Sequence, residues 1–438
     1  MSDLTPRHAL SLAREHLDLF PGLIIEGARQ VGKSTLAAML AEGRDATFLS
    51  LDDEATRAAA VADPQWFVTQ GGDGVLVVDE IQRCPELTLA LKANIDRDRR
   101  PGRFILTGSA SLLRVRGMAD SLVGRVGRLT LFGLSQGERL HRADDFAAAA
   151  AATLADQPDT DLVAVASQVR RDDYVGLVAV GGFPAVQHLS ERQRRLWHDA
   201  YIDGLVHRDL GELNRQYDPR RALSVLRVLA GRPSAELVKA KVAQQADLPA
   251  STVTTYLDLF EAVGLVTVLP AWTANLSGRQ GKRDKSLLLD SGLATRLSRL
   301  TVHQLGQPSY SESFGAYLES FVAAELLKQR TWSREEFELF HYRERTGVEV
   351  DLVIELADGR VIGIEVKASS TYKGDYFNGL RHLRDRVGPR FIGGFVLSTA
   401  DAGYRYSDRL YGLPVSALWS LPCPSAQDPS SQDPPSQR

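Results

Sequence analysis

The segment GARQVGKS, residues 27–34, constrains the fold of this chain more than any other part of the sequence. An apolar run at residues 23–25 precedes it, and helix-forming residues at 35–42 follow it. A glycine-rich loop between a buried strand and a helix is an arrangement that holds phosphate groups. The sequence therefore predicts an α/β fold with a parallel sheet and a nucleotide site at the end of this strand.

Each residue type in this loop suits the binding of phosphate. Gly27 and Gly32 allow the backbone to curl, so that successive N–H groups point at phosphate oxygens near the positive end of the following helix. We expect Lys33 to reach the β- and γ-phosphates as a catalytic residue and Ser34 to ligate Mg²⁺. The predicted nucleotide-binding residues are Gly27, Ala28, Arg29, Gln30, Val31, Gly32, Lys33, Ser34 and Thr35.

A second strand is predicted within VLVVDEIQ, residues 75–82. Four consecutive apolar residues are typical of a buried parallel strand, and the two carboxylates after them would lie at the edge where such strands open onto a ligand. We expect Asp79 to hold Mg²⁺ through water and Glu80 to activate the attacking water.

A third apolar strand, residues 103–106, is followed by Thr107, Gly108 and Ser109. In a shared parallel sheet its end would lie beside the first two, which places a hydroxyl group near the γ-phosphate. Ser109 is the preferred residue for sensing that phosphate, and Thr107 is the second choice. The alternative is that each strand serves the core alone, but three apolar strands with these endings fit one site.

The nucleotide is predicted to be ATP. No Asn-Lys-x-Asp pattern of guanine-binding proteins occurs, and the adjacent carboxylates Asp79 and Glu80 suit hydrolysis by activated water. Two arginines downstream, Arg125 and Arg128, could contact the γ-phosphate within the chain or from a neighbouring subunit, and Arg125 is the candidate catalytic arginine. The alternative is that both lie on the solvated surface.

Composition indicates a multidomain globular protein. The chain has 438 residues, of which 44% are hydrophobic, and this length is typical of two to four domains. No apolar run approaches the length of a membrane span, and the N-terminal residues lack the apolar core of a signal peptide. We therefore expect a cytoplasmic location and no membrane partner.

A net charge of −3 excludes a uniformly basic nucleic-acid binder, so any DNA contact has to come from local patches. Each of two patches carries four basic residues: Arg220, Arg221, Arg227 and Arg232 on or just after a predicted helix, and Arg279, Lys282, Arg283 and Lys285 in a loop. Both patches could follow a phosphate backbone, and the alternative is that both are solvated surface.

The middle of the chain is predicted to be helical. The Ala-rich stretch 146–154 lacks a strong core pattern, and we interpret it as a linker or variable insertion within a helical lid or connector, residues 141–215. Residues 216–275 contain a helix, a turn, a second helix and a β-rich segment, which favours a winged-helix module.

The second helix of that module has a predicted buried stripe of Val253, Leu257 and Phe260. Its outward positions carry no Lys or Arg, which weakens the case for direct contact with DNA bases. A scaffold or a protein-contacting module is therefore the alternative to a DNA-binding one.

A β-hairpin is predicted at residues 348–367, where two alternating strands flank an Asp-Gly turn. The number of residues in the loop decides which side chains share a face. A three-residue loop with a left-handed Gly359 would place Leu356 opposite Arg360. A two-residue loop would shift the pairing by one residue.

With the three-residue loop, Asp351 lies opposite Glu365 and Lys367 lies opposite Glu349, all on one face. With the shorter loop, Asp351 would lie opposite Val366 and the two carboxylates would be separated across the sheet. The hypothesis of a second site therefore requires the three-residue loop.

Two converging carboxylates that hold a metal, Asp351 and Glu365, together with Lys367, suit phosphodiester hydrolysis. Glu319, on a predicted helix at 313–329, could complete the metal site. The alternative is a charged, solvent-exposed hairpin without catalytic activity.

Seven motifs occur in the order GARQVGKST, VLVVDEIQ, ILTGSAS, GRVGRLTLFGLS, GGFPAV, LDSGL and IEVK. Over nearly the whole chain they resemble the bacterial and archaeal ATPases with an AAA-type (AAA_14) N-terminal domain and a C-terminal DUF4143 region. The resemblance implies a P-loop NTPase sheet of the AAA/ASCE type in residues 1–140 and a restriction-endonuclease-like α/β domain of the PD-(D/E)xK class in residues 276–423. By position, Glu319, Asp351, Glu365 and Lys367 match the nuclease elements. Residues 424–438 are predicted to be a disordered tail.

The preferred hypothesis is a Mg²⁺-dependent ATPase whose nucleotide state positions a nucleic-acid-acting C-terminal module, with ATP and DNA as partners. The main alternative is an ATP-driven regulatory switch that acts on a protein partner and has a silent nuclease-like domain. A third hypothesis makes the hairpin the active part and ATP a stabiliser. A homo-oligomer is expected only by analogy.

Overall fold

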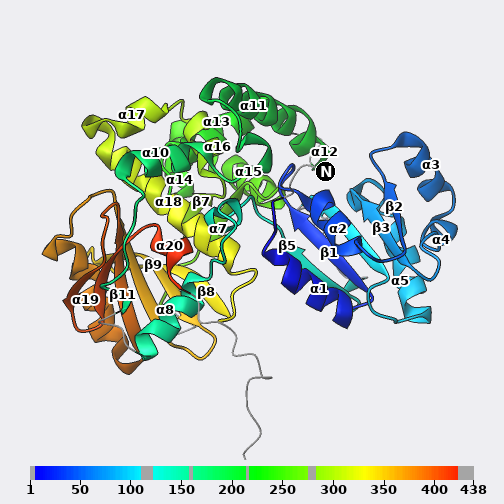
Figure 1. Ribbon diagram of the computed structural model, residues 1–438. Coiled ribbons are helices and arrows are strands. Elements are labelled where there is room, and N and C mark those ends of the chain that lie inside the picture. The colour runs from blue at the N-terminus through cyan, green and yellow to red at the C-terminus, as the bar shows by residue number, and fades with distance from the viewer. Residues whose placement is uncertain (1–4, 110–121, 157–160, 214–216, 275–282, 423–438) are drawn as a thin grey trace, which may run out of the picture.

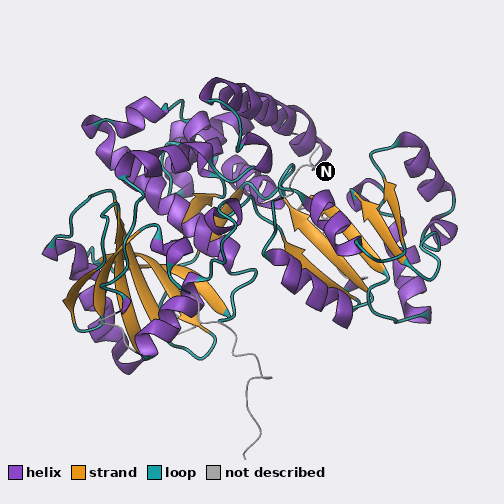
Figure 2. Cartoon of the chain, viewed as in Figure 1, coloured by secondary structure: helices purple, strands orange, loops and turns teal. Residues whose placement is uncertain are grey.

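The computed structural model describes residues 5–109, 122–156, 161–213, 217–274 and 283–422. An N-terminal sheet and a C-terminal sheet lie apart, and helices from the middle of the chain lie above the C-terminal sheet and between the two (Figure 1). Figure 2 shows that most helices of this middle part form one group without a large sheet of their own. The predicted tail, 424–438, lies outside the described residues.

The N-terminal sheet is parallel throughout and has the strand order β2-β3-β4-β1-β5. Its strands are β1 (Gly22–Gly27), β2 (Ala46–Ser50), β3 (Val75–Asp79), β4 (Phe104–Ser109) and β5 (Val126–Thr130). Its helices are α1 (Ala9–Leu19), α2 (Lys33–Ala41), α3 (Glu54–Ala62), α4 (Pro64–Phe67) and α5 (Leu87–Arg97), with the short turn η1 (Ile81–Arg83) after β3. This confirms the predicted α/β fold with a parallel sheet.

Alternating apolar residues make both faces of this sheet part of a core. On one face Leu23 and Ile25 of β1 belong to the cluster that contains α1 and α2, and on the other Ile24 belongs to the cluster that contains α5. A strand buried on both faces needs apolar residues without a polar alternation, which is the pattern that identified β1, β3 and β4. The carboxyl ends of these three strands therefore meet at one edge.

The helical part that follows consists of several short elements. They are α7 (Gln136–Arg139), α8 (Phe146–Ala155), α10 (Arg171–Val180), η2 (Pro184–Val186), α11 (Glu191–Gly204), the π-helix η3 (Leu205–Asp209) and α12 (Leu210–Leu213). Helix α8 corrects the interpretation of the Ala-rich stretch as a linker. Its residues 146–151 are buried, and it packs on strand β11 (Phe391–Ser398) of the C-terminal sheet. A helix that is covered on every side can be apolar on every side, so its sequence shows no amphipathic period.

Next come α13 (Pro219–Ala230), α14 (Lys239–Ala246) and α15 (Ala250–Ala262), followed by the antiparallel ribbon of β6 (Val266–Leu269) and β7 (Lys285–Leu288). Val253, Leu257 and Phe260 of α15 are buried, as predicted. Because β6 pairs with β7, the predicted boundary at residue 275 divides a structural unit. The helices α16 (Ser291–Leu297), α17 (Val302–Gly306) and α18 (Ser311–Gln329), with the turn η5 (Pro308–Tyr310), complete this part.

The C-terminal sheet has the order β12-β13-β11-β10-β9-β8. Its elements are β8 (Phe337–Arg343), β9 (Glu349–Leu356), β10 (Val361–Lys367), η6 (Gly374–Phe377), α19 (Asn378–Val387), η7 (Gly388–Arg390), β11 (Phe391–Ser398), β12 (Tyr404–Ser407), β13 (Leu410–Pro414) and α20 (Ala417–Ser420). Strands β8, β9 and β10 are antiparallel, whereas β10, β11 and β13 are parallel. Residues of α18 and α19 belong to separate apolar clusters, each of which includes strand residues of this sheet.

The hairpin β9–β10 has the three-residue loop. The backbone N–H of Leu356 donates to Arg360 O at 2.9 Å, and Gly359 has a left-handed φ of 83°. The strands continue in this register, with Ile354 opposite Ile362. The register required for two carboxylates on one face is therefore confirmed.

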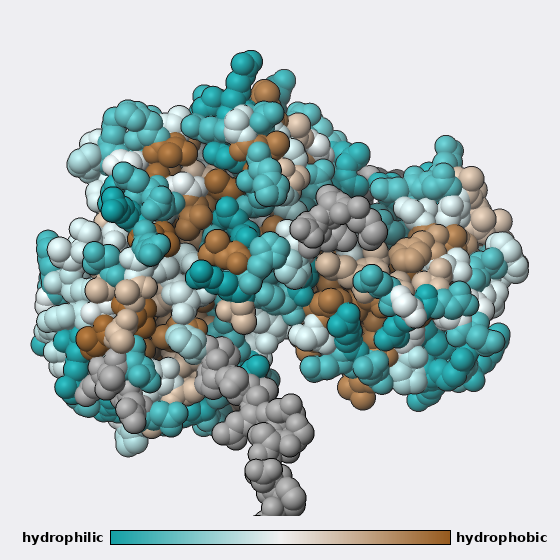
Figure 3. Space-filling model, in the orientation of Figure 1, coloured by the Kyte–Doolittle hydropathy of each residue, from teal (hydrophilic) through white to brown (hydrophobic). Residues whose placement is uncertain are grey.

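Most of the surface on the side shown in Figure 3 is hydrophilic or intermediate, and apolar residues gather there in limited patches. Among the described residues, no helix combines the length and the apolar character that a bilayer crossing requires.

A buried ion pair on α18 joins the C-terminal part of the chain to the end of the N-terminal domain. Lys328 Nζ lies 2.6 Å from Glu325 Oε1 and donates to the backbone oxygen of Leu134 at 2.9 Å. The second carboxylate oxygen of Glu325 accepts the N–H of Gln136 at 2.8 Å. Both side chains are almost completely buried, so each charge depends on the other for compensation.

The substitution Lys328→Met should destabilise the protein by about 3–5 kcal/mol, because it leaves Glu325 as an uncompensated buried charge. The matched control is Arg330→Met, which breaks the exposed pair with Glu338 and should cost less than about 1 kcal/mol. Urea unfolding of the two variants beside the wild type measures the difference. A cost for Lys328→Met no greater than that of the control would contradict the role given to this pair.

Candidate functional site

The phosphate-binding loop begins where β1 ends. Gly27 has a φ of 155°, and a Cβ atom at this position would lie 2.1 Å from the backbone oxygen of Leu131. Gly32, at the start of α2, has a left-handed φ of 99°. Glycine at these positions therefore serves both backbone conformation and close packing. The loop leads directly into α2, in the strand-loop-helix order predicted from the sequence.

The Lys33 side chain lies inside this loop. Its ammonium group donates to the backbone oxygens of Gly27 at 3.2 Å and Ala28 at 3.0 Å. Burial lowers the pKa of Lys33, although the carboxylates around it, Glu80 first, act in the opposite direction. A buried ammonium held among loop atoms is positioned to meet a phosphate group at the centre of the loop.

Asp79 contacts residues that follow or end the other two predicted strands. Its Oδ1 accepts a hydrogen bond from Ser34 Oγ at 2.9 Å and another from Thr107 Oγ1. Thr107 in turn accepts the backbone N–H of Glu80 at 3.3 Å. The hydroxyl and carboxylate oxygens of Ser34 and Asp79 are the kind of hard donors that Mg²⁺ prefers, so this pair fits the predicted metal.

Of the two hydroxyl residues predicted on β4, the structure places Thr107 in contact with Asp79. Ser109, the preferred residue, pairs with Gly27 in the sheet register, but its side chain lies outside the described part of the chain.

Glu80 has a left-handed φ of 57°, which is uncommon for a residue other than glycine. Burial raises the pKa of its carboxyl group, although Lys33 acts in the opposite direction. Gln82 donates a hydrogen bond to Glu80 Oε2, a partner that the sequence alone did not indicate. An unusual backbone conformation together with a raised pKa is common at catalytic positions.

A cavity of about 940 Å³ lies over these groups and includes residues that were not predicted. Asp52 and Arg83, paired at 2.5 Å, come from the N-terminal domain, whereas Pro184, Ala185 and Arg208 come from the helical part. The GGFPAV motif contains Pro184 and Ala185 and was the available sequence signal for part of this wall.

The helical part also reaches the loop through Asp209 at the end of η3. Its Oδ1 lies 3.1 Å from Arg29 Nη1 and 3.1 Å from Arg208 Nε. Tyr201 of α11 donates to the backbone oxygen of Arg29 at 3.4 Å. The loop is therefore in contact with two side chains that no local motif identified.

The structure does not place Arg125 at the nucleotide site of its own chain. Residue 126 pairs with Gly22 at the beginning of β1, so Arg125 lies at the edge of the sheet opposite the loop. Its guanidinium makes two bonds of 2.9 Å to the carboxylate of Asp96. Arg128 pairs with Glu26 at 3.1 Å. Of the alternatives left open by the sequence, action of Arg125 within its own chain does not fit this position, because sequence order did not show at which end of β5 it lies. Contact with the site of a neighbouring subunit stays a prediction.

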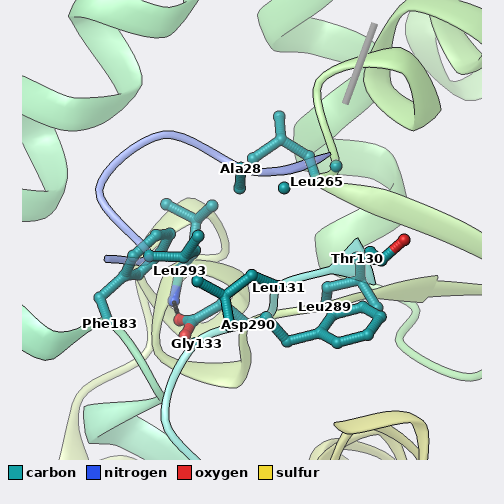
Figure 4. A pocket seen from close by; sticks show the side chains of 13 residues that line it. Ala28, Thr130, Leu131, Gly133, Phe183, Leu265, Leu289, Asp290 and Leu293 are labelled. Atoms are coloured by element: carbon teal, nitrogen blue, oxygen red, sulfur yellow. Dashed lines mark hydrogen bonds between the residues drawn. The ribbon is translucent and has the colours of Figure 1, made fainter. Parts of the chain in front are cut away.

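An apolar cavity of about 40 Å³ lies behind the loop (Figure 4). The side chains of Leu131, Phe183 and Leu293, which come from three different segments, line it together with Ala28. Asp290 of the LDSGL motif lies beside them.

Asp290 connects two of the motifs. Its carboxylate accepts the N–H groups of Gly182, from GGFPAV, at 2.7 Å and of Leu293 at 2.8 Å. A Cβ atom at Gly181 would lie 2.4 Å from Asp290 Oδ1. The two glycines of GGFPAV therefore allow a close contact between the helical part and the segment that begins α16.

The buried guanidinium of Arg7 contacts the phosphate-binding loop. Arg7 donates from Nη1 to Val31 O and from Nη2 to Phe132 O, both at 2.8 Å, and from Nε to Glu138 Oε1 at 3.0 Å. Glu138 is completely buried and also accepts the N–H groups of His8 and Ser135. The three nitrogens of one arginine thus connect the loop, the strand end after β5 and helix α7.

The hairpin places Asp351, Glu365 and Lys367 in one cluster. Lys367 Nζ lies 2.9 Å from Glu365 Oε2 and 3.8 Å from Asp351 Oδ2, and the same Asp351 oxygen accepts the N–H of Val366 at 2.8 Å. Both carboxylates are 5% exposed. Glu349, the fourth residue of the predicted face, pairs with Arg343 at 2.9 Å.

Glu319, on α18, joins this cluster as predicted, but it brings a partner that was assigned elsewhere. Lys285 Nζ lies 2.7 Å from Glu319 Oε1, and the Lys285 side chain is 7% exposed. The prediction of Lys285 as part of a surface patch was therefore wrong. Of the other residues in that patch, Arg283 is exposed, and Arg279 and Lys282 lie outside the described residues.

The charges in this cluster strongly affect one another. Burial, and then Asp351, raise the pKa of Glu319 to about 8, although Lys285 acts in the opposite direction. Burial and Asp351 also raise the pKa of Glu365. Burial alone would lower the pKa of Lys285, but the attraction of Glu319 and Asp351 raises it, so Lys285 stays charged.

The predicted metal ligands of the hairpin do not fit a divalent ion in this arrangement. One carboxylate oxygen of Glu319 and one of Glu365 bond to ammonium groups. Within the described ranges of the chain, no three His, Cys, Asp or Glu side chains form a group that could hold a metal. Asp351 and Glu365 thus come together as expected. The positive charges beside them and beside Glu319 are the ammonium groups of lysines, where a metal ion was predicted.

Comparison with known families identifies three matched segments. Residues 20–140 match the AAA domain family AAA_14, residues 171–304 match a domain of unknown function, DUF8612, and residues 314–418 match another, DUF4143. The AAA and DUF4143 parts of the predicted organisation are therefore confirmed. The second segment crosses the boundary predicted between the connector and the winged-helix module.

Similar proteins are known in sequence and in structure. Uncharacterized proteins of Mycobacterium tuberculosis and Mycobacterium bovis are each 29% identical over 371 residues, which is 83% of this chain and 74% of theirs. A Walker-type ATPase of Pyrococcus abyssi aligns with a TM-score of 0.42 and 15% identity over 67% of this chain and 96% of its own. The Holliday junction branch migration motor of Thermotoga maritima aligns with a TM-score of 0.27 and 18% identity over 60% and 87%.

Arg7 should control the position of the phosphate-binding loop. We expect Arg7→Gln to raise the KM for ATP by about tenfold or more, which corresponds to about 1.4 kcal/mol, because the loop loses a charged donor at Val31. Arg7→Lys should recover part of the affinity, since one ammonium can replace only some of the three contacts. The control is Arg14→Gln on the exposed side of α1.

Steady-state kinetics and thermal unfolding of the three variants measure the effect. A lower unfolding temperature for Arg7→Gln with an unchanged KM would show that Arg7 serves stability alone and does not position the loop.

Proposed function

We propose that this protein is a Mg²⁺-dependent ATPase that works as a switch. The observation that carries the proposal is the convergence of Ser34, Asp79 and Thr107 in one hydrogen-bonded group, beside Lys33 and Glu80, under one cavity. The match of residues 20–140 to the AAA domain family supports ATP as the nucleotide. Together the residues supply the parts that phosphoryl transfer to water requires.

In this proposal the backbone N–H groups of the loop and the ammonium of Lys33 bind the β- and γ-phosphates. Ser34 and Asp79 would hold Mg²⁺, which would supply positive charge to offset the negative charge of the phosphates. Thr107 donates a hydrogen bond to Asp79, and we propose that it senses the γ-phosphate. Ser109 stays a candidate for the same role.

Glu80 is the proposed general base. Its raised pKa brings the carboxyl group nearer to the range in which it can accept a proton from water, and Glu80 lines the cavity at the end of β3. Gln82 restrains the carboxylate through its hydrogen bond. Arg208, in the wall of the cavity, is the arginine we propose for contact with phosphate in place of Arg125.

Several contacts support a switch rather than an isolated hydrolase. Arg29 of the loop is bound by Asp209 and Tyr201, and the cavity wall includes Pro184 next to the glycines that contact Asp290. A loop that moves when the γ-phosphate is lost would change these contacts directly. A protein partner that binds the helical or C-terminal part would then respond to the nucleotide state.

Action on nucleic acid is the second candidate, and one observation favours it. Four arginines on or just after α13 are exposed and form a basic surface: Arg220, Arg221, Arg227 and Arg232. Such a surface can neutralise backbone phosphates without reading base sequence. This second candidate includes two structural assignments. It takes α13–α15 with β6 and β7 as a winged helix, and it takes the C-terminal sheet as nuclease-like.

Hydrolysis should depend on three residues in different ways. Lys33→Ala should abolish ATP binding, whereas Glu80→Gln should retain binding and lower kcat by about 100-fold or more, as loss of a general base does. Thr107→Val should lower kcat with little effect on affinity, and Thr47→Val in the edge strand β2 is its matched control. Ser109→Ala tests the alternative hydroxyl.

Phosphate release and binding of a fluorescent ATP analogue provide the two readouts. Unchanged hydrolysis in both Lys33→Ala and Glu80→Gln would disprove the proposed ATPase site.

The two candidates differ in their behaviour toward DNA. The switch proposal predicts no cleavage of supercoiled or linear DNA with Mg²⁺ or Mn²⁺, with or without ATP. The second candidate predicts cleavage that Asp351→Ala removes. It also predicts binding that falls between 50 and 200 mM salt, by on the order of 10³-fold if about six phosphates are contacted.

The variant Arg227→Gln/Arg232→Gln is the test for the binding surface, and Arg330→Gln is its control. Fluorescence anisotropy with a labelled duplex measures it. Salt-sensitive binding that the double variant weakens, together with Asp351-dependent cleavage, would favour the nucleic-acid candidate over the switch.

A further inference from the structure

The charged cluster of the C-terminal domain contains a lysine that the domain does not itself supply. Lys285 belongs to β7, which lies in the segment 171–304, whereas Glu319, Asp351 and Glu365 lie in the segment 314–418. The Lys285 side chain reaches Glu319 Oε1 at 2.7 Å and is almost fully buried. This contact crosses from the β6–β7 ribbon to helix α18.

The backbone of Lys285 is held on both sides. It pairs with Leu269 in the β6–β7 ribbon, and it forms a bridge to Glu236 on its other side. The neighbouring N–H groups of Leu237 and Ser286 add hydrogen bonds of 2.7 and 3.2 Å between the same two segments. The ammonium therefore cannot leave the cluster by a small shift of the strand.

Two ammonium groups offset most of the negative charge of the cluster without any bound ion. Three carboxylates, those of Glu319, Asp351 and Glu365, face the ammonium groups of Lys285 and Lys367. Carboxylates that hold Mg²⁺ or Mn²⁺ must turn oxygens toward one point at about 2.0–2.2 Å from the ion. Here an oxygen of Glu319 and an oxygen of Glu365 bond to nitrogen instead.

We propose that Lys285 is a built-in cation that takes the place of a divalent metal in this cluster and fastens the C-terminal domain to the preceding segment. The wild-type cluster is then closed to metal, and removal of the Lys285 ammonium opens it. This goes beyond the proposed ATPase switch and does not depend on it, because no residue of the nucleotide site takes part.

Lys285→Met tests the proposal, since methionine keeps most of the side-chain length and removes the charge. The full-length protein is titrated with Mn²⁺ by calorimetry in the absence of nucleotide. We expect one Mn²⁺ site in Lys285→Met that the wild type lacks, with at least a tenfold difference in affinity. Adding Asp351→Asn to Lys285→Met should remove this site.

Thermal unfolding gives a second readout. Lys285→Met should unfold at a lower temperature than the wild type, and Mn²⁺ should raise that temperature in the variant but not in the wild type. The matched control is Lys328→Met, which also removes a buried lysine paired with glutamate. It should unfold at a lower temperature as well, with no recovery by Mn²⁺.

Two results would overturn the proposal. The first is Mn²⁺ binding by the protein with Lys285 intact, if the substitution Asp351→Asn abolishes that binding. The other is a folded Lys285→Met protein that binds no Mn²⁺ at this cluster. If the methionine variant does not fold, Lys285→Gln replaces it in both measurements, and failure of both variants to fold even with Mn²⁺ present counts against metal replacement.

Discussion

The buried guanidinium of Arg7 is the interaction on which the nucleotide site depends. A phosphate-binding loop must keep its N–H groups directed inward, and a loop rich in glycine has little rigidity of its own. Arg7 compensates for this by fixing Val31 O at the same time as Phe132 O and Glu138. Because Glu138 is completely buried, loss of Arg7 would remove the cation paired with it and leave only two N–H donors, so we expect both loop position and domain stability to depend on Arg7.

The same contact begins a route from the loop to the C-terminal domain. Glu138 binds the N–H of Ser135, the next residue donates its N–H to Glu325, and Glu325 is paired with Lys328. Each step is a charged or charge-assisted contact in a buried setting, where hydrogen bonds are strong and displacement is costly. These buried contacts connect the loop to α18, which also carries Glu319.

Local patterns were sufficient to predict the strand ends of the nucleotide site, but they left two registers open for the β9–β10 hairpin. Asp79 and Thr107 meet because parallel strands end at one edge, and the left-handed Gly359 sets the pairing through turn chemistry. The partners from distant segments were not predictable in this way. Arg7 and Glu138 are 131 residues apart, and Lys285 lies in a charged stretch that is indistinguishable in sequence from solvated surface.

The two carboxylate sites differ in the chemical groups that contact the carboxylates, and this difference distinguishes the functions that we propose for them. Asp79 accepts hydrogen bonds from two hydroxyl groups and lines a cavity of about 940 Å³, so its negative charge is available to attract an incoming cation. Glu319 and Glu365 each bond to an ammonium group, and Asp351 and Glu365 are almost fully buried. Hydroxyl partners are neutral and leave the carboxylate charge available, whereas ammonium partners neutralise it. On these grounds we propose that ATP is hydrolysed at the N-terminal sheet and that the charged cluster of the C-terminal sheet joins two segments of the chain.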